Sequence, residues 1–221
     1  MTIAHHPGLE NLMSCSAGSM PEAFAAVMAS HIGMCPVCRM ELVLMHDIGV
    51  ELFSSLAPSP LAGKIPIMAM RRAEAETGGD AAPARSPDGL TEGGMPVILA
   101  PYAGNDLCKV AWRRLAPGVQ HFPIALSAGA KGGSLRLLKI APGKAIPAHG
   151  HRGSELTLVL RGSFRDETGL YGVGDVADHF DETEHQPVAD PEGGCVCLVA
   201  SEKKFRFKSV MARLFQPFTG L

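Results

Sequence analysis

The spacing of apolar residues predicts helices in the first part of the chain. Between Val37 and Phe53, apolar side chains recur every three or four residues, at Val37, Met40, Leu44, Ile48 and Leu52. This spacing is the pattern of an amphipathic helix. Upstream, residues 9–29 hold shorter apolar runs broken by Gly18 and Pro21, which predict one short helix followed by a longer one. The first fifty residues therefore predict a small helical bundle, and a further helix is expected from Pro66 to about Glu76.

The character of the chain changes after this helical part. Residues 78–94 are rich in Gly, Pro and Ala and lack periodic apolar positions, so they are expected to form a linker. The later segments predicted as strands are Leu135–Ile140, Glu155–Leu160, Cys195–Ala200 and Phe205–Phe207. Strands separated by Gly- and Pro-containing turns at this spacing are typical of a sandwich or barrel. The sequence therefore predicts a multidomain α and β protein, with a helical domain at 1–77, a flexible linker at 78–94 and a β-domain at 95–221.

Composition and charge narrow the class of protein. The 221 residues are 46% hydrophobic, which is ordinary for a globular protein. No stretch approaches the roughly 20 apolar residues that cross a bilayer, and the first residues lack the pattern of a secretory signal. We therefore expect a cytoplasmic protein that does not bind membranes. Residues 1–90 contain 5 Lys+Arg against 9 Asp+Glu, so a basic protein partner is expected and direct binding of nucleic acid is not.

The cysteines indicate metal ligation and not a disulfide framework. The chain has 6 cysteines, and cytoplasmic thiols are kept reduced. Cys35 and Cys38 have the spacing of a ligand pair. Cys195 and Cys197 share one face of a predicted strand, where we expect small core residues. The alternatives are a redox pair or residues that surround the ligands of a metal site.

The first group of candidate metal ligands is His31-x3-Cys35-x2-Cys38. His31 is expected to end one helix and the cysteines to open the next, where the helix dipole favours thiolates. The fourth ligand is expected from the N-terminal segment, in which His5 and His6 are candidates and His6 is preferred. Two His and two Cys close a tetrahedral zinc site, which is structural. The alternatives are a redox pair or two buried thiols.

The second group has the pattern Gly143-x5-His149-x-His151-x3-Glu155-x6-Gly162. His149 and His151 are two residues apart on an extended segment, so their side chains point to the same face. Glu155 begins the next strand and returns a carboxylate to that interior. His185 is preferred as the fourth ligand over His179, which is expected on the surface among acidic residues. Three His and one Glu suit zinc, iron, manganese or nickel.

The second pattern resembles the first motif of cupins. Together with the first group, it makes the chain resemble the ChrR-type zinc-binding anti-sigma factors. This resemblance implies a small N-terminal helical zinc-binding bundle followed by a C-terminal cupin, a double-stranded β-helix jelly-roll barrel. It implies that zinc is held by His6, His31, Cys35 and Cys38. It also implies that zinc or another divalent transition metal is held in the cupin by His149, His151, Glu155 and His185.

The resemblance further implies a partner and a signal. The helical domain would bind and inhibit an extracytoplasmic-function-type sigma factor. The cupin would be needed to respond to singlet oxygen or related oxidants and to release the sigma factor, so the protein would not be an enzyme. The alternative hypothesis is a metal-dependent, dioxygenase-like cupin enzyme acting on a small diketone or related carbon acid, whose chemistry requires an open coordination position.

Overall fold

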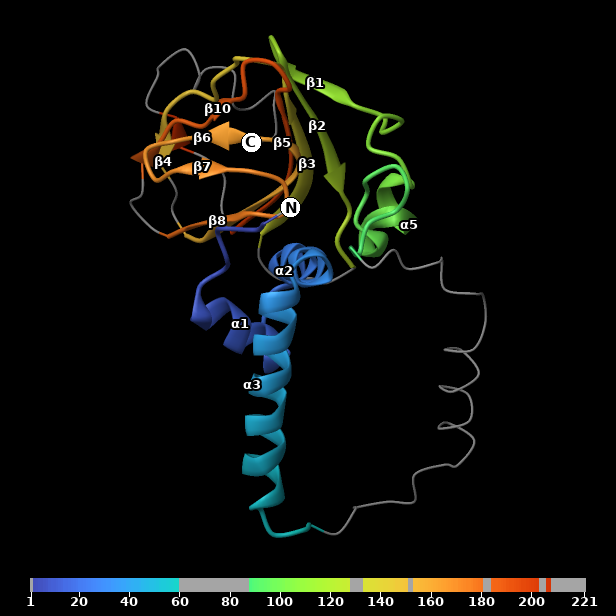
Figure 1. Cartoon of the computed structure of the whole chain (residues 1–221), viewed down its shortest axis with the longest axis vertical. Coiled ribbons are helices and arrows are strands. Elements are labelled where there is room, and N and C mark those ends of the chain that lie inside the picture. The colour runs from blue at the N-terminus through green and yellow to red at the C-terminus, as the bar shows by residue number, and fades with distance from the viewer. Residues whose placement is uncertain are drawn as a thin grey trace.

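The computed structural model describes residues 2–59, 88–127, 133–150, 153–180, 184–202 and 206–207. Helices of the N-terminal part lie beside a β-structure formed by the later part of the chain (Figure 1). The helix predicted at 66–76 and the first part of the predicted linker, residues 78–87, lie outside the described residues. The helical elements are α1 (Leu9–Ser16), α2 (Glu22–Met34), α3 (Pro36–Ser54), the 3-10 turn η1 (Val97–Leu99) and α5 (Ala100–Ala103).

The strands form one large and two small antiparallel sheets. The large sheet has the order β1-β2-β3-β11-β5-β8, and the small sheets have the orders β10-β6-β7 and β12-β4-β9. The predicted strands at 135–140, 155–160 and 195–200 are confirmed as β3, β5 and β11. The strand bounds are β1 (Arg113–Ala116), β2 (Val119–Ile124), β3 (Ser134–Ile140), β4 (His149–Gly150), β5 (Glu155–Gly162), β6 (Phe164–Arg165), β7 (Leu170–Tyr171), β8 (Val176–His179), β9 (Glu184–His185), β10 (Val188–Ala189), β11 (Cys195–Ser201) and β12 (Arg206–Phe207).

Strand β11 is buried on both faces because the large sheet is covered on both sides. Cys195 and Cys197 pack with Phe164 of the small sheets, in the interior of the β-sandwich. The alternate residues, Leu198 among them, belong to a second core on the opposite face. The prediction that the two cysteines are small core residues is confirmed, since both are 2% exposed.

Helix α2 covers the second face of the large sheet. Phe24, Val27 and Met28 are buried in one core with Leu156 and Leu158 of β5. Each such side chain contributes roughly 1.5–3 kcal/mol when it is removed from water. The helical and β parts are therefore joined by a continuous hydrophobic core, which the sequence did not indicate.

The end of the predicted linker is also packed. Gly89 has a φ of +64°, and a Cβ there would lie 2.7 Å from the backbone of Gly33, at the end of α2. The backbone N–H of Val97 donates to the Gly89 carbonyl at 3.0 Å. The boundaries 1–77, 78–94 and 95–221 stay a prediction, because residues 60–87 are not described.

Helix α3 points away from the rest of the molecule (Figure 1). The chain bends by 115° between α2 and α3, with Cys35 as the N-cap of α3 and Pro36 at its first position. The predicted helix is confirmed, but Met40, Leu44 and Ile48 are 66%, 57% and 61% exposed and do not pack in a bundle of described residues. Within the described part of the chain, no single helix is long and apolar enough to span a membrane. Helices α2 and α3 meet these two criteria only when they are taken together, as a pair bent by 115°.

Candidate metal centres

The first group of predicted ligands comes together at the junction of the N-terminal segment, α2 and α3. His6 precedes α1, His31 lies in the last turn of α2, and Cys35 and Cys38 open α3. His6 Nδ1 lies 3.5 Å from Cys35 Sγ and 3.3 Å from Cys38 Sγ. His31 Nε2 lies 3.3 Å from Cys38 Sγ. One ligand atom from each of the four residues lies within 4.8 Å of the other three, and only His6 is exposed.

These separations fit a tetrahedral zinc ion. Zn–S bonds of about 2.3 Å and Zn–N bonds of about 2.05 Å at tetrahedral angles place N and S about 3.6 Å apart. The orientation of His31 agrees, since its Nδ1 lies 2.9 Å from the Gly174 carbonyl oxygen. A carbonyl only accepts, so Nδ1 carries the proton and Nε2 is left with a lone pair toward the sulfurs.

The electrostatics of this cluster favour a cation. Burial is the main reason that the pKa of His31 falls to about 4, so its imidazole is neutral and able to ligate. Burial, with the neighbouring Cys35, raises the pKa of the Cys38 thiol to about 12. The Cys38 thiolate therefore needs a bound cation to exist at neutral pH.

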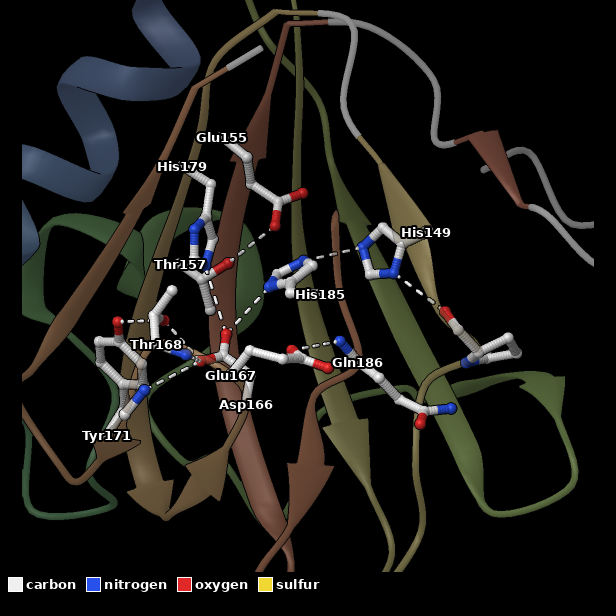
Figure 2. A network of polar contacts seen from close by, with 12 residues as sticks. His149, Glu155, Thr157, Asp166, Glu167, Thr168, Tyr171, His179, His185 and Gln186 are labelled. Carbon is white, nitrogen blue, oxygen red and sulfur yellow. Dashed lines mark hydrogen bonds and ion pairs between the residues drawn. The ribbon is translucent and has the colours of Figure 1, made fainter. Parts of the chain in front are cut away.

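The second group lies between the sheets of the β-sandwich (Figure 2). Strands β4 and β9 pair with His149 opposite His185, and Glu155 begins β5. The two Nε2 atoms of His149 and His185 lie 3.1 Å apart. His149, Glu155 and His185 are all buried, and each offers a ligand atom within 4.8 Å of the others. His151 lies outside the described residues, so its place as a ligand stays a prediction.

This arrangement also fits a metal ion. Two imidazole nitrogens that bind one metal at about 2.05 Å lie about 2.9–3.4 Å apart for angles between octahedral and tetrahedral. His149 Nδ1 donates to the Pro147 carbonyl oxygen at 3.0 Å, and His185 Nδ1 lies 3.0 Å from Asp166 Oδ2. Both contacts turn Nε2 toward the cluster, as the outer partners of metal-binding histidines do.

Burial controls the charge of the second cluster as well. Burial, with the neighbouring His185, lowers the pKa of His149 to about 4. Burial raises the pKa of Glu155 to about 8, although the hydrogen bond from Thr157 and the charge of Arg136 act in the opposite direction. A cation beside Glu155 would offset the cost of its buried charge.

Sequence reasoning missed two members of this site. His179 was predicted on the surface, but it is 3% exposed, and its Nε2 lies 3.4 Å from Asp166 Oδ2. Asp166, which follows β6, also contacts His185 and was not singled out. The signal for His179 was the alternation of β8, because Ala177 and His179 share the face that looks into the sandwich. The acidic residues beside His179 in the sequence favoured the wrong prediction that it lies on the surface.

A small cavity adjoins the second cluster. It has a volume of about 50 Å³, and its walls include His149, Glu155 and His185 together with apolar side chains such as Leu138 and Phe164. This volume holds only a few water-sized molecules.

Comparison with known proteins agrees with this geometry. Residues 103–204 match the family model described as the ChrR Cupin-like domain. The chain is 39% identical over 218 residues to the anti-sigma-E factor ChrR of Cereibacter sphaeroides, covering 99% of both chains. The chain belongs to the ChrR family. ChrR of Rhodobacter sphaeroides, crystallised in complex with SigE, superposes with a TM-score of 0.71 and 36% identity over 90% of this chain and 100% of that chain.

Membership of the ChrR family confirms the predicted class of fold, a helical N-terminal part followed by a cupin. Of the ligands that the resemblance implied, the structure brings together all four of the first group and three of the second, His149, Glu155 and His185. That these residues bind metal, and which metal they bind, stays a prediction.

Proposed function

We propose that this protein is a cytoplasmic anti-sigma factor that binds and inhibits an extracytoplasmic-function-type sigma factor through its N-terminal helices. The exposed apolar helix α3 is the observation that carries the proposal. The relatives named as an anti-sigma factor, one of them crystallised with SigE, support it. We further propose that zinc holds the N-terminal part and that the cupin cluster responds to singlet oxygen or related oxidants.

Helix α3 has the character of a protein-binding surface. Its exposed apolar side chains extend along most of its length and include Val37, Met40, Val43, Leu44, Ile48, Val50, Leu52 and Phe53. Contiguous exposed apolar patches of this kind are rare on monomers and mark interaction sites. Glu41, Asp47 and Glu51 flank the patch, whereas Arg39 is the single Lys or Arg of the helix. The matching surface of the sigma factor is therefore expected to be apolar with a basic rim.

Zinc at the first cluster would fix how α3 is presented. The four ligands come from the N-terminal segment, the end of α2 and the start of α3, so one ion would join all three at the 115° bend. A closed set of two His and two Cys supplies folding energy to a small unit. Loss of this ion would release α3 from α2 and weaken sigma binding.

The cupin cluster suits a small diffusible signal. The cavity of about 50 Å³ beside His149, Glu155 and His185 admits molecules of a few atoms. Pockets for drug-sized ligands usually begin at about 300 Å³, so this cavity is too small for a ligand of that size. The family relationship weighs against the alternative of a dioxygenase-like enzyme.

An in vitro transcription assay tests the proposal. The zinc-loaded full-length protein is added to core RNA polymerase with each extracytoplasmic-function-type sigma factor of the source organism in turn, and the transcripts are quantified. We expect full inhibition by the native protein and a loss of at least tenfold in potency for Cys35→Ser/Cys38→Ser. Cys108→Ser is the matched control, because Cys108 is exposed and distant in sequence from both clusters. Inhibition that persists after both cysteines are replaced would refute the proposed role of zinc. Absence of inhibition by the native protein would refute the anti-sigma function.

A further inference from the structure

The N-terminal segment that carries His6 is held along the edge of the large sheet by two aspartates. The backbone N–H groups of Ala4 and His5 donate to Asp175 Oδ1 at 2.7 and 3.0 Å. The Gly8 N–H and the Asn11 side-chain amide donate to Asp178 Oδ2 at 2.9 and 2.8 Å. Asp178 belongs to β8, the edge strand next to β5, and Asp175 immediately precedes it. The position of His6 therefore depends on β8.

The second histidine of the first cluster depends on the same strand. His31 Nδ1 donates to the carbonyl of Gly174, in the turn that leads into β8. The approach is close: Gly174 has a φ of +90°, and a Cβ there would lie 2.7 Å from the Ile3 side chain. In Figure 1 the blue N-terminal segment lies beside β8, and α2 packs against the neighbouring strands β5 and β11. Both imidazoles of the first cluster are thus positioned by the β8 region.

The other face of β8 reaches the cupin cluster. His179 follows Asp178 in the strand, so their side chains point to opposite faces of the sheet. His179 Nε2 lies 3.4 Å from Asp166 Oδ2, and the same oxygen lies 3.0 Å from His185 Nδ1 (Figure 2). His185 Nε2 in turn lies 3.1 Å from His149 Nε2. The side chain of Asp166 is 0% exposed, and its carboxylate is shared by a residue of β8 and a predicted ligand.

We propose that β8 couples the two clusters, so that a change at the cupin ligands alters the position of the N-terminal ligands. The coupling runs through Asp166, His179 and Asp178. The route does not use the segment between α3 and the cupin. A metal that fixes His185 also fixes Asp166, and Asp166 then holds His179 and the four-residue edge strand. When the cupin ligands are lost or oxidised, β8 loosens and releases the segment that carries His6. This inference rests on the proposed function and describes its regulation.

Hydrogen exchange in the full-length zinc-loaded protein tests the coupling. His149→Ala removes a predicted ligand of the cupin cluster that lies in β4 and not in β8. We expect it to raise the exchange rate of the peptide covering residues 2–12 by about tenfold, as expected for a loss of about 1.4 kcal/mol of local stability. Asp178→Ala should raise the same rate, and the double variant should exchange little faster than either single variant, because both act on one element.

Matched controls separate coupling from general loosening. His46→Ala and Glu192→Ala replace an exposed histidine and an exposed acidic residue, and they should leave the exchange rate of the 2–12 peptide unchanged. If His149→Ala fails to fold, judged by Trp112 fluorescence, the more conservative His149→Gln is used to remove this ligand instead. Loss of the cupin metal without faster exchange at residues 2–12 would overturn the coupling, and so would multiplicative effects in the double variant. Sigma binding by the native protein is measured in parallel: binding without coupling refutes only this inference, whereas coupling without binding refutes the proposed function.

Discussion

Replacing Glu155 by Gln is expected to change stability in opposite directions in the metal-free and the metal-loaded protein. Glu155 is 3% exposed, and burial, only partly offset by Thr157 and Arg136, raises the pKa of its carboxyl from 4.5 to about 8. At neutral pH the metal-free folded protein therefore keeps a proton that the unfolded chain has lost. Gln has nearly the same shape and no charge, so the substitution removes this titration.

The size of the effect follows from the difference in pKa. Below pH 4.5 the carboxyl is protonated in both states, and its contribution to stability is fully present. As the pH rises through 4.5 toward 8, the unfolding free energy falls by about 1.4 kcal/mol per pH unit, because the unfolded state binds fewer protons. Over the 2.5 units from 4.5 to pH 7, the loss is about 3 kcal/mol. Glu155→Gln should therefore stabilise the metal-free protein at pH 7 by up to about 3 kcal/mol.

Urea unfolding followed by the fluorescence of Trp112, the single tryptophan, measures this effect. Chelator-treated native and Glu155→Gln proteins are compared at pH 5 and pH 7, with Glu192→Gln as an exposed control. Excess zinc should reverse the order of stability, since an amide oxygen is a weaker ligand than a carboxylate. A metal-free Glu155→Gln protein that is no more stable than the native protein at pH 7, or whose advantage does not grow from pH 5, would refute the reasoning.

Three further predictions follow from the clusters and the core. Gly174→Ala adds a Cβ 2.7 Å from Ile3 at a φ of +90° and should lower the free energy of unfolding by about 1–3 kcal/mol. It should also speed the release of zinc to a chromogenic chelator. An unchanged rate of zinc release would contradict the role of Gly174. Zinc binding should tighten from pH 6 to pH 8 and release protons, because the pKa of the Cys38 thiol is about 12 without metal. Calorimetry in two buffers detects the released protons. A zinc affinity that does not change with pH would contradict thiolate ligation. Leu158→Ala should destabilise by about 2–5 kcal/mol in urea, and a loss below 1 kcal/mol would contradict its place in the core.

The sequence predicted the parts of both clusters that are close together along the chain. His31, Cys35 and Cys38 span one helix junction, so their spacing alone places them together. His149 and Glu155 are similarly close. Asp166 was missed because its role depends on long-range contacts with His179 and His185, which only the sheet pairing creates.

The periodicity of α3 predicted a helix correctly but not its surroundings. A stripe that includes Leu44 and Ile48 has the same pattern whether it packs inside its own chain or against another protein. Likewise, the apolar residues of α2 gave no sign that they cover Leu156 and Leu158 of the large sheet. Periodicity identifies an apolar face, but the partner of that face depends on tertiary structure.

The most direct measurement is the mass of the complex between the zinc-loaded full-length protein and the sigma factor that it inhibits, by size-exclusion chromatography with light scattering. We predict a one-to-one complex for the native protein and for Glu192→Gln. Leu44→Glu/Ile48→Glu places two charges in the exposed patch of α3 and should abolish the complex while leaving Trp112 fluorescence unchanged. Separate elution of the native protein and the sigma factor, or an undiminished complex with the α3 variant, would contradict binding through this helix.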